Sequence, residues 1–377
     1  MLRGGVAAAF ALGGIATAGA CAPPEGAVGP PARKEPRPGY YPADYDRIVE
    51  ASKKERELTI YSNMDSYNWQ PVIEGFQRHY PWIEKISSTN LGSGEVFQRY
   101  YAESSRGNTR TSLMVSGAPQ NWSDMSRDKR VADYRSPELS RLPDFGRPLR
   151  GVYTFSADVI VLAYNKILME ASERPSSLAE IVELTEREPD RFRHMITTYT
   201  TNASFGLAIH RAYNLWLQRG GKDPWETYDA LLPFTRAEES SGPMLDKIAS
   251  GEYLLGYFMS STIVFPQQVQ VGKAVGWSYI RDASPLFLRG MGVPARCPHP
   301  NTGRLMLDYI LSHEGQVNVG RGGFTPYRED VTTKETPHTY TSITEEVGAD
   351  NIVLIGYDQG TEKEQEAFSE EWVKRLG

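Results

Sequence analysis

The chain has 377 residues, of which 40% are hydrophobic and 23% charged, a composition typical of a large folded protein and not of a disordered one. Its formal net charge at pH 7 is −6, and its basic residues are interspersed with acidic ones rather than gathered in a stripe. We therefore do not expect a nucleic-acid partner.

The first 21 residues are typical of an export signal. Arg3 is followed by a run of small and apolar residues over 6–18, which is too short to span a bilayer, and then by Gly19-Ala20-Cys21. Cysteine after small residues is typical of a lipoprotein signal, in which Cys21 is lipidated and becomes the new N-terminus. An ordinary cleavage after Ala20 is the alternative. Either way we expect an exported protein of the periplasm or cell envelope, held to the membrane, if at all, only by a lipid anchor.

Residues 22–54 follow as a proline-rich tether and lead-in. Six prolines fall between positions 23 and 38. Prolines stiffen and extend a chain, so such a segment suits a spacer between a membrane anchor and a soluble body. This favours lipidation of Cys21 over simple cleavage.

Short apolar runs and helical patterns alternate from residue 57 onward. Six apolar runs predict strands, at 57–62, 83–89, 112–116, 157–164, 195–199 and 254–259. Helices are predicted between them, at about 69–80, from 94, from 175, at about 205–219 and at about 240–250. Strands that alternate with helices at this spacing predict a parallel α/β sheet.

Residues 301–316, NTGRLMLDYILSHEGQ, predict a buried helix that begins after Pro300 and ends at 313–316. This stretch resembles a helix of bacterial extracellular solute-binding proteins, which serve ABC importers. In that family Gly-Gln ends a helix of the first lobe, and a Y/F-P-x-R loop follows. Here the loop is Phe324-Thr325-Pro326-Tyr327-Arg328. Within the family, the chain resembles the iron-binding branch.

The resemblance covers residues 57–330, and it implies the α/β, two-lobed periplasmic-binding-protein (Venus flytrap) fold with a ligand cleft between the lobes. Lobe 1 is expected to take 57–163 and 277–322, and lobe 2 to take 164–276 and 323–377. The expected partners are a small-molecule solute and an ABC permease in the membrane, and the protein itself is expected to be a monomer.

In this fold the loops at the carboxyl ends of strands and at helix N-termini contact the ligand. Small polar residues occupy these loops, and for each loop a solvated turn with a helix N-cap is the alternative. The candidate ligand contacts are Ser62, Asn63, Asp65, Ser93, Ser116, Gly117, Tyr199, Thr200, Thr201, Asn202, Ser260, Ser261 and Thr262.

The iron-binding branch holds Fe³⁺ with a histidine on the first loop, a glutamate on the third and two adjacent tyrosines on the fifth. The resemblance places these four positions at Asp65, Gly117, Ser261 and Thr262. One carboxylate and two hydroxyls do not replace an imidazole, a carboxylate and two phenolates around a hard cation. We therefore expect no metal ligands and no cofactor, and ferric iron remains an alternative ligand.

The resemblance also implies an anion site, because iron-binding relatives hold phosphate or carbonate on a strand-to-helix loop near an arginine. The matching loop here is Thr200-Thr201-Asn202-Ala203, and Arg281-Asp282 matches the arginine segment. We expect a small polar solute that is anionic or zwitterionic and bears a phosphate, phosphonate or carboxylate. An ion pair within the protein is the alternative for Arg281. A ligand-sensing adaptor of a membrane receptor is an alternative function.

Residues suited to catalysis are not grouped in the sequence. The six histidines are scattered and form no H-E-x-x-H pair, and no G-x-S-x-G motif is present. Cys297 has no cysteine partner once Cys21 is lipidated or removed, so a disulfide framework is excluded. We do not expect an enzyme.

Overall fold

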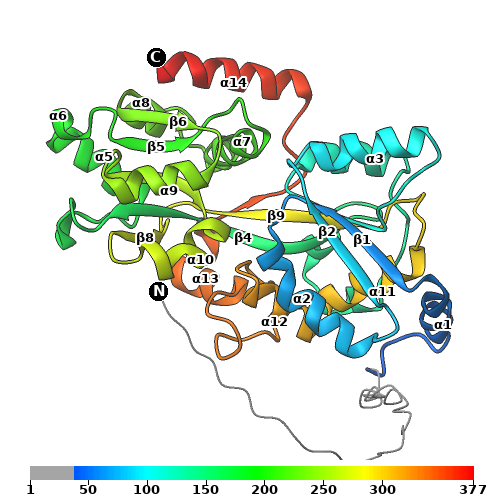
Figure 1. The fold of residues 1–377 in the computed structure, drawn as a ribbon. Helices are drawn as coiled ribbons and strands as arrows, with labels where there is room; N and C mark the ends of the chain where they lie inside the picture. The colour runs from blue at the N-terminus through cyan, green and yellow to red at the C-terminus, as the bar shows by residue number, and fades with distance from the viewer. Residues whose placement is uncertain (1–37) are drawn as a thin grey trace, which may run out of the picture.

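The computed structural model describes residues 38–377. Their strands form a mixed sheet in the order β2-β1-β3-β9-β4-β7-β5-β6, with β10 added to β9 and β8 to β4. Two long strands near the middle, β4 (Tyr153–Asn165) and β9 (Ser284–Gly292), pair antiparallel and run from one half of the molecule into the other. Helices gather around both ends of this pair, which gives two lobes (Figure 1).

The first lobe contains the N-terminal part of the described chain. Its strand β1 pairs in parallel with both β2 and β3, and β3 joins β9. Its elements are α1 (Asp46–Glu55), β1 (Glu57–Ser62), α2 (Ser66–His79), β2 (Lys85–Asn90), α3 (Glu95–Ser105), β3 (Leu113–Ser116), α4 (Pro119–Arg127), α11 (Pro300–Leu311) and α12 (His313–Arg321).

The second lobe holds the middle and the end of the chain. Its strand β5 pairs in parallel with β6 and β7, while β7 and β8 pair antiparallel with β4. Its elements are α5 (Leu178–Arg187), α6 (Pro189–Phe192), β5 (Ile196–Tyr199), α7 (Ser204–Arg219), α8 (Glu226–Leu231), β6 (Thr235–Glu238), α9 (Ser241–Ser250), β7 (Leu255–Ser260), α10 (Ser261–Val271), β8 (Val275–Tyr279), α13 (Tyr340–Val347), β10 (Ile352–Ile355) and α14 (Glu362–Leu376).

The six predicted strands correspond to β1, β2, β3, part of β4, β5 and β7. The prediction of a parallel sheet is wrong for its centre. The chain crosses from the first lobe to the second along β4 and returns along β9, so these two strands run in opposite directions. The alternation of strands and helices within each lobe carries no information about the direction of the strands that connect the lobes.

Each lobe has its own buried apolar core, and the two cores meet near the β4–β9 pair. The expected boundary at 163/164 falls inside β4. Phe324 and Tyr327, which the expected ranges place in lobe 2, pack into the core of the first lobe. They lie there because α12 packs against α2 of the first lobe, and the chain continues from the end of α12 at residue 321.

The predicted helix over 301–316 does not end at 313–316. Instead α11 ends at Leu311 and α12 starts at His313, with the Ser312 hydroxyl accepting a hydrogen bond from Gly315 N at 3.1 Å. A Cβ atom on Gly315 would lie 1.7 Å from the Tyr309 carbonyl oxygen. Glycine is therefore required by the close approach of α12 to α11 and does not serve as a helix stop.

Gln316 explains why glutamine follows this glycine. Its side-chain amide donates to the carbonyls of Phe155 and Ile310 at 3.0 and 3.1 Å, and its carbonyl accepts from Tyr327 N at 3.1 Å. The side chain is fully buried. The Gln316 side chain thus links β4, α11 and the loop after α12 within the first lobe.

The export signal, Cys21 and most of the expected tether lie outside the described residues. From residue 38 the chain packs onto the first lobe, where α1 lies against α11. Tyr45 and Tyr134 donate hydrogen bonds to Asp308 Oδ2 at 2.7 and 2.6 Å, and Tyr41 donates to Glu138 at 2.6 Å. Residues 40–54, expected as a lead-in, thus belong to the folded body. No helix among the described residues is long and apolar enough to cross a membrane.

Gly315→Ala is expected to lower the free energy of unfolding by about 1–3 kcal/mol, because α12 must move away from Tyr309 to admit the methyl group. Urea denaturation measures this loss. Gly242→Ala is the matched control, since Gly242 lies in α9 with open space where its Cβ would be. Equal stability of the Gly315 variant and the wild type would contradict the packing role.

Burial raises the pKa of Asp308 to about 7. Because the folded state holds this proton more tightly than the unfolded state, the stability that it contributes is complete below about pH 4 and is lost as pH rises toward and through 7. Asp308→Asn should remove this dependence, on the order of 2 kcal/mol between pH 5 and 7.5. Urea denaturation of both proteins at the two pH values measures it. The same change in stability with pH in both proteins would contradict the assignment.

Candidate functional site

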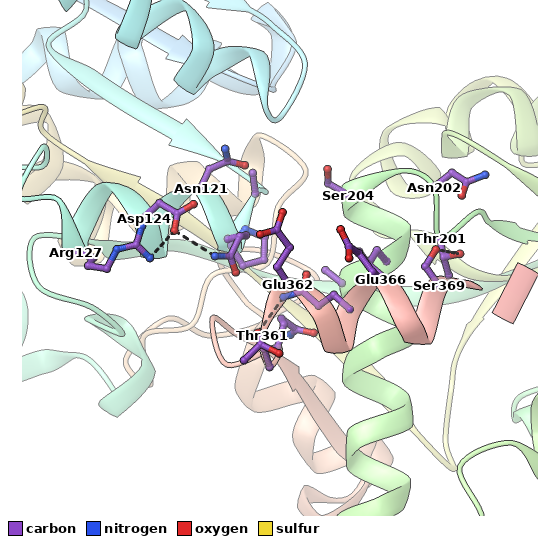
Figure 2. A pocket seen from close by; sticks show the side chains of 18 residues that line it. Asn121, Asp124, Arg127, Thr201, Asn202, Ser204, Thr361, Glu362, Glu366 and Ser369 are labelled. Atoms are coloured by element: carbon purple, nitrogen blue, oxygen red, sulfur yellow. Dashed lines mark hydrogen bonds and ion pairs between the residues drawn. The ribbon is translucent and has the colours of Figure 1, made fainter. Parts of the chain in front are cut away.

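A cavity of about 850 Å³ opens between the lobes. Figure 2 shows its walls: α4 of the first lobe on one side, the start of α7 on the other, and the first turns of α14 below. The residues that line it are Ala118, Pro119, Gln120, Asn121, Asp124, Arg127, Thr201, Asn202, Ser204, Leu207, Ala208, Gln359, Gly360, Thr361, Glu362, Gln365, Glu366 and Ser369. Of the candidate residues named from the sequence, Thr201 and Asn202 are among them.

The start of α7 faces this cavity without a side-chain cap. Strand β5 ends at Tyr199, and the N-cap residue of α7 is Ala203, which has no side-chain acceptor for the N–H groups of the first turn. Gly206 lets the helix start close to the preceding loop, since a Cβ there would lie 2.2 Å from the Thr200 carbonyl oxygen. Uncapped N–H groups at the positive end of a helix suit an anionic group.

Carboxylates form the other polar part of the lining. Asp124 comes from α4, and Glu362 and Glu366 come from one face of α14 (Figure 2). Arg127 is the one basic residue of the lining, and it pairs with Asp124 at 2.9 Å. The charge that remains in the cavity is therefore negative at the α14 wall.

Four candidate residues of the first lobe meet in a hydrogen-bonded cluster at the ends of β1 and β3. Asn63 donates to Ser93 Oγ at 3.0 Å and accepts from Gly117 N at 3.3 Å. Ser116 donates to the Ser93 carbonyl at 2.8 Å. The cluster holds the loops after β1, β2 and β3 to one another.

Two further candidates of the first lobe serve its structure. Ser62 is buried and accepts a hydrogen bond from Trp69 Nε1 at 2.9 Å. Asp65 caps α2 and accepts from Asn90 at 2.7 Å. Neither lines the cavity described above.

The candidates of the second lobe gather around Ser241, at the start of α9. Its hydroxyl bonds the phenol of Tyr199 and accepts from Ser260 N at 3.0 Å. Ser260 and Thr262 share a hydrogen bond of 2.8 Å. Ser261 is buried, and within residues 38–377 its hydroxyl has no partner. Closer to the cavity, Thr200 Oγ1 accepts from Asn202 N at 3.2 Å.

Arg281 lies apart from these residues. Its side chain is largely exposed, pairs with Glu346 at 3.7 Å and lines a separate cavity together with Trp277 and His338. The neighbouring Asp282 accepts from the N–H groups of Leu178 and Ala179, both at 2.9 Å, and so caps α5. The structure therefore shows the ion pair within the protein, which the sequence left as the alternative for Arg281.

Sequence reasoning missed a buried ion pair in the crossing strands. Arg289 of β9 donates to Asp158 of β4 at 2.9 Å and to Asn63 Oδ1 at 2.8 Å. Arg289 is 4% exposed and Asp158 is fully buried. Burial raises the pKa of Asp158, against the opposing effect of the Arg289 guanidinium. The sequence feature that could have indicated this ion pair is the single aspartate inside the apolar run at 157–164.

No group of three or more His, Cys, Asp and Glu residues within 38–377 is arranged to hold a metal ion. The four positions at which the iron-binding resemblance places its ligands lie apart in two sets. Asp65 and Gly117 are in the loops of the first lobe, and Ser261 and Thr262 are in α10 of the second.

No protein-family model matches the sequence, and no curated protein matches it. Solved structures do match the fold. The substrate-binding protein of an ABC transporter from Agrobacterium tumefaciens aligns with a TM-score of 0.72 at 21% identity, over 85% of this chain and 95% of its own. Iron-bound HitA from Pseudomonas aeruginosa aligns at 0.67 and 14% identity, over 84% and 99%. The periplasmic binding protein AfuA from Actinobacillus pleuropneumoniae, with fructose-6-phosphate bound, aligns at 0.62 and 16% identity, over 85% and 98%. The chain has the two-lobed fold of these proteins.

Asp158→Ala and Arg289→Ala are each expected to lower the free energy of unfolding by about 3–5 kcal/mol, because each leaves a buried charge without its partner. The double variant Asp158→Ala with Arg289→Ala should lose much less than the sum, because it leaves neither charge buried without its partner. Urea denaturation of all three variants measures the coupling. Additive losses would show that the two side chains act independently.

Proposed function

We propose, from a fold shared with the substrate-binding protein of an ABC transporter, that this protein is an extracytoplasmic solute-binding protein of an ABC import system. It captures a small polar solute between its lobes and delivers it to a membrane permease. The observation that supports this proposal most is the cavity between α4 and α7, since it has walls from both lobes. A solute bound there contacts both lobes at once, and its binding energy favours the arrangement in which both contacts are made.

The proposed solute is anionic or zwitterionic and carries a phosphate, phosphonate or carboxylate. Its anionic group lies at the start of α7, where Thr201, Asn202 and Ser204 surround uncapped N–H groups. The guanidinium of Arg281 takes no part in this proposal, because it pairs with Glu346 in a separate cavity.

An organic solute is favoured over ferric iron, although iron-bound HitA shares the fold. The positions where iron ligands are expected carry Asp65, Gly117, Ser261 and Thr262, and Asp65 is engaged as a helix cap. Hydroxyls and amides, by contrast, are suited to a polar organic molecule.

We also propose that the signal of residues 1–21 directs export of the protein and that Cys21 is lipidated. A lipid on Cys21 would hold the protein at the membrane surface, close to the permease. The described chain begins at residue 38 beside Tyr41 and Glu138, so any tether joins the first lobe there. Transport requires no covalent chemistry from the protein.

Ser204→Asp tests the anion site, because it places a carboxylate where the anionic group of the solute would lie. We expect at least one member of a panel of phosphate, phosphonate, carboxylate and amino-acid solutes to raise the melting temperature of the wild type. At 100 times its Kd, a ligand adds about 2.7 kcal/mol. The variant should lose this gain while its empty form stays as stable or becomes slightly more so, since acids favour a helix N-terminus.

Ser66→Asp is the matched control, since it makes the same substitution in the first turn of α2, outside the cavity. Differential scanning fluorimetry of the three proteins provides the measurement. Equal stabilisation of the Ser204 variant by the same solute would contradict the anion site. The lack of any stabilising solute in the panel would speak against the proposed function itself.

A further inference from the structure

The C-terminal helix contributes more to the cavity than its place at the end of the chain suggests. Its first turns lie across the opening between the lobes, next to α4 and the start of α7 (Figure 2). Ser369 donates a hydrogen bond to Thr201 Oγ1 at 2.9 Å, which holds α14 against the loop that precedes α7. The helix therefore forms one wall of the cavity.

Glu362 and Glu366 are the carboxylates that this wall presents. They are four residues apart on a helix, so they share one face with their Cβ atoms about 6 Å apart. Both side chains are exposed, and among the described residues neither has an ion-pair or hydrogen-bond partner. The capping of α14 does not need them, because Thr361 and Glu364 form its capping box.

The basic residue of the lining does not neutralise these carboxylates. Arg127 pairs with Asp124 at 2.9 Å and with Asp128 at 3.3 Å, and it is thus already compensated. Two negative charges remain on the α14 side of a cavity whose α7 side is electropositive.

A second observation at the same wall indicates a missing donor. Gln359 lines the cavity with only 6% of its surface exposed. Its amide nitrogen donates to the Gly356 carbonyl at 3.1 Å, but its amide oxygen is buried and has no partner within residues 38–377. A buried acceptor without a donor costs on the order of 1–3 kcal/mol, and a rotation of the Gln359 side chain that turns this oxygen into the cavity would let a ligand N–H group satisfy it.

We infer that the wall formed by Glu362, Glu366 and Gln359 binds a positively charged, donor-rich group of the solute, either a primary ammonium or a guanidinium. This inference rests on the proposed function and narrows it. The solute is a zwitterion whose anionic group lies at the start of α7 and whose cationic group lies against α14. The C-terminal helix then contributes to specificity, because it favours anionic solutes that carry a positive charge at their other end.

Isothermal titration calorimetry of the purified full chain tests this inference with four probes: L-arginine, putrescine, succinate and inorganic phosphate. We expect a probe with a cationic end, L-arginine or putrescine, to bind. Glu362→Gln combined with Glu366→Gln should weaken that binding at least ten-fold. The pair Glu186→Gln and Glu345→Gln makes the same change in charge at exposed positions outside the cavity and should leave the binding unchanged. Circular dichroism melting curves establish that all variants fold.

Equal weakening by the two pairs of substitutions would overturn the inference, since it would reflect net charge alone. Binding of the cationic probes that neither pair changes would also overturn it. Binding of succinate or phosphate only, lost in Ser204→Asp, would overturn the role of α14 and leave the proposed function standing. Binding of none of the four probes would overturn the inference as well, and it would speak against the proposed function only if the wider solute panel also failed.

Discussion

The antiparallel pairing of β4 with β9 is the constraint on which the rest of the structure depends. Both strands belong to both lobes, and Asp158 and Arg289 form a buried ion pair between them. Irregularities in strand register lie on either side of Asp158, between Thr154 and Ser156 and between Val161 and Ala163. Such irregularities bend and twist a strand, so the two lobes meet at an angle rather than extending one flat sheet. A cleft between the lobes follows from this bend.

The ion pair also ties the crossing strands to the loops of the first lobe. Arg289 bonds Asn63, and Asn63 in turn bonds Ser93 and the backbone of Gly117. Most small polar residues at the strand ends are thus used to hold the loops of one lobe to each other. The start of α7, which faces the cavity, has no side-chain cap, and the carboxylates that α14 presents to the cavity have no ion-pair partner among residues 38–377.

Apolar periodicity is a local signal, and it predicted six strands that the described residues form, but it did not predict β6, β8, β9 or β10. The sequence also placed Thr201 and Asn202 at a strand-to-helix loop, where they line the cavity. It did not predict the antiparallel centre of the sheet, because strand direction is set by contacts distant in sequence. The prediction that the helix ends around Gly315 was wrong for a related reason. The sequence pattern shows a glycine, but it does not show that the carbonyl of Tyr309 lies beside it. Glu362 and Glu366 were missed because nothing local links the last helix to the cleft.

Native mass spectrometry of the protein purified from cells, compared with its denatured mass, shows whether a zwitterionic solute is bound between the lobes. We expect a retained organic molecule, lost on unfolding, that carries both an anionic and a cationic group. A mass excess of a single iron ion would contradict it, because it would require ligands where this chain has Asp65, Gly117, Ser261 and Thr262.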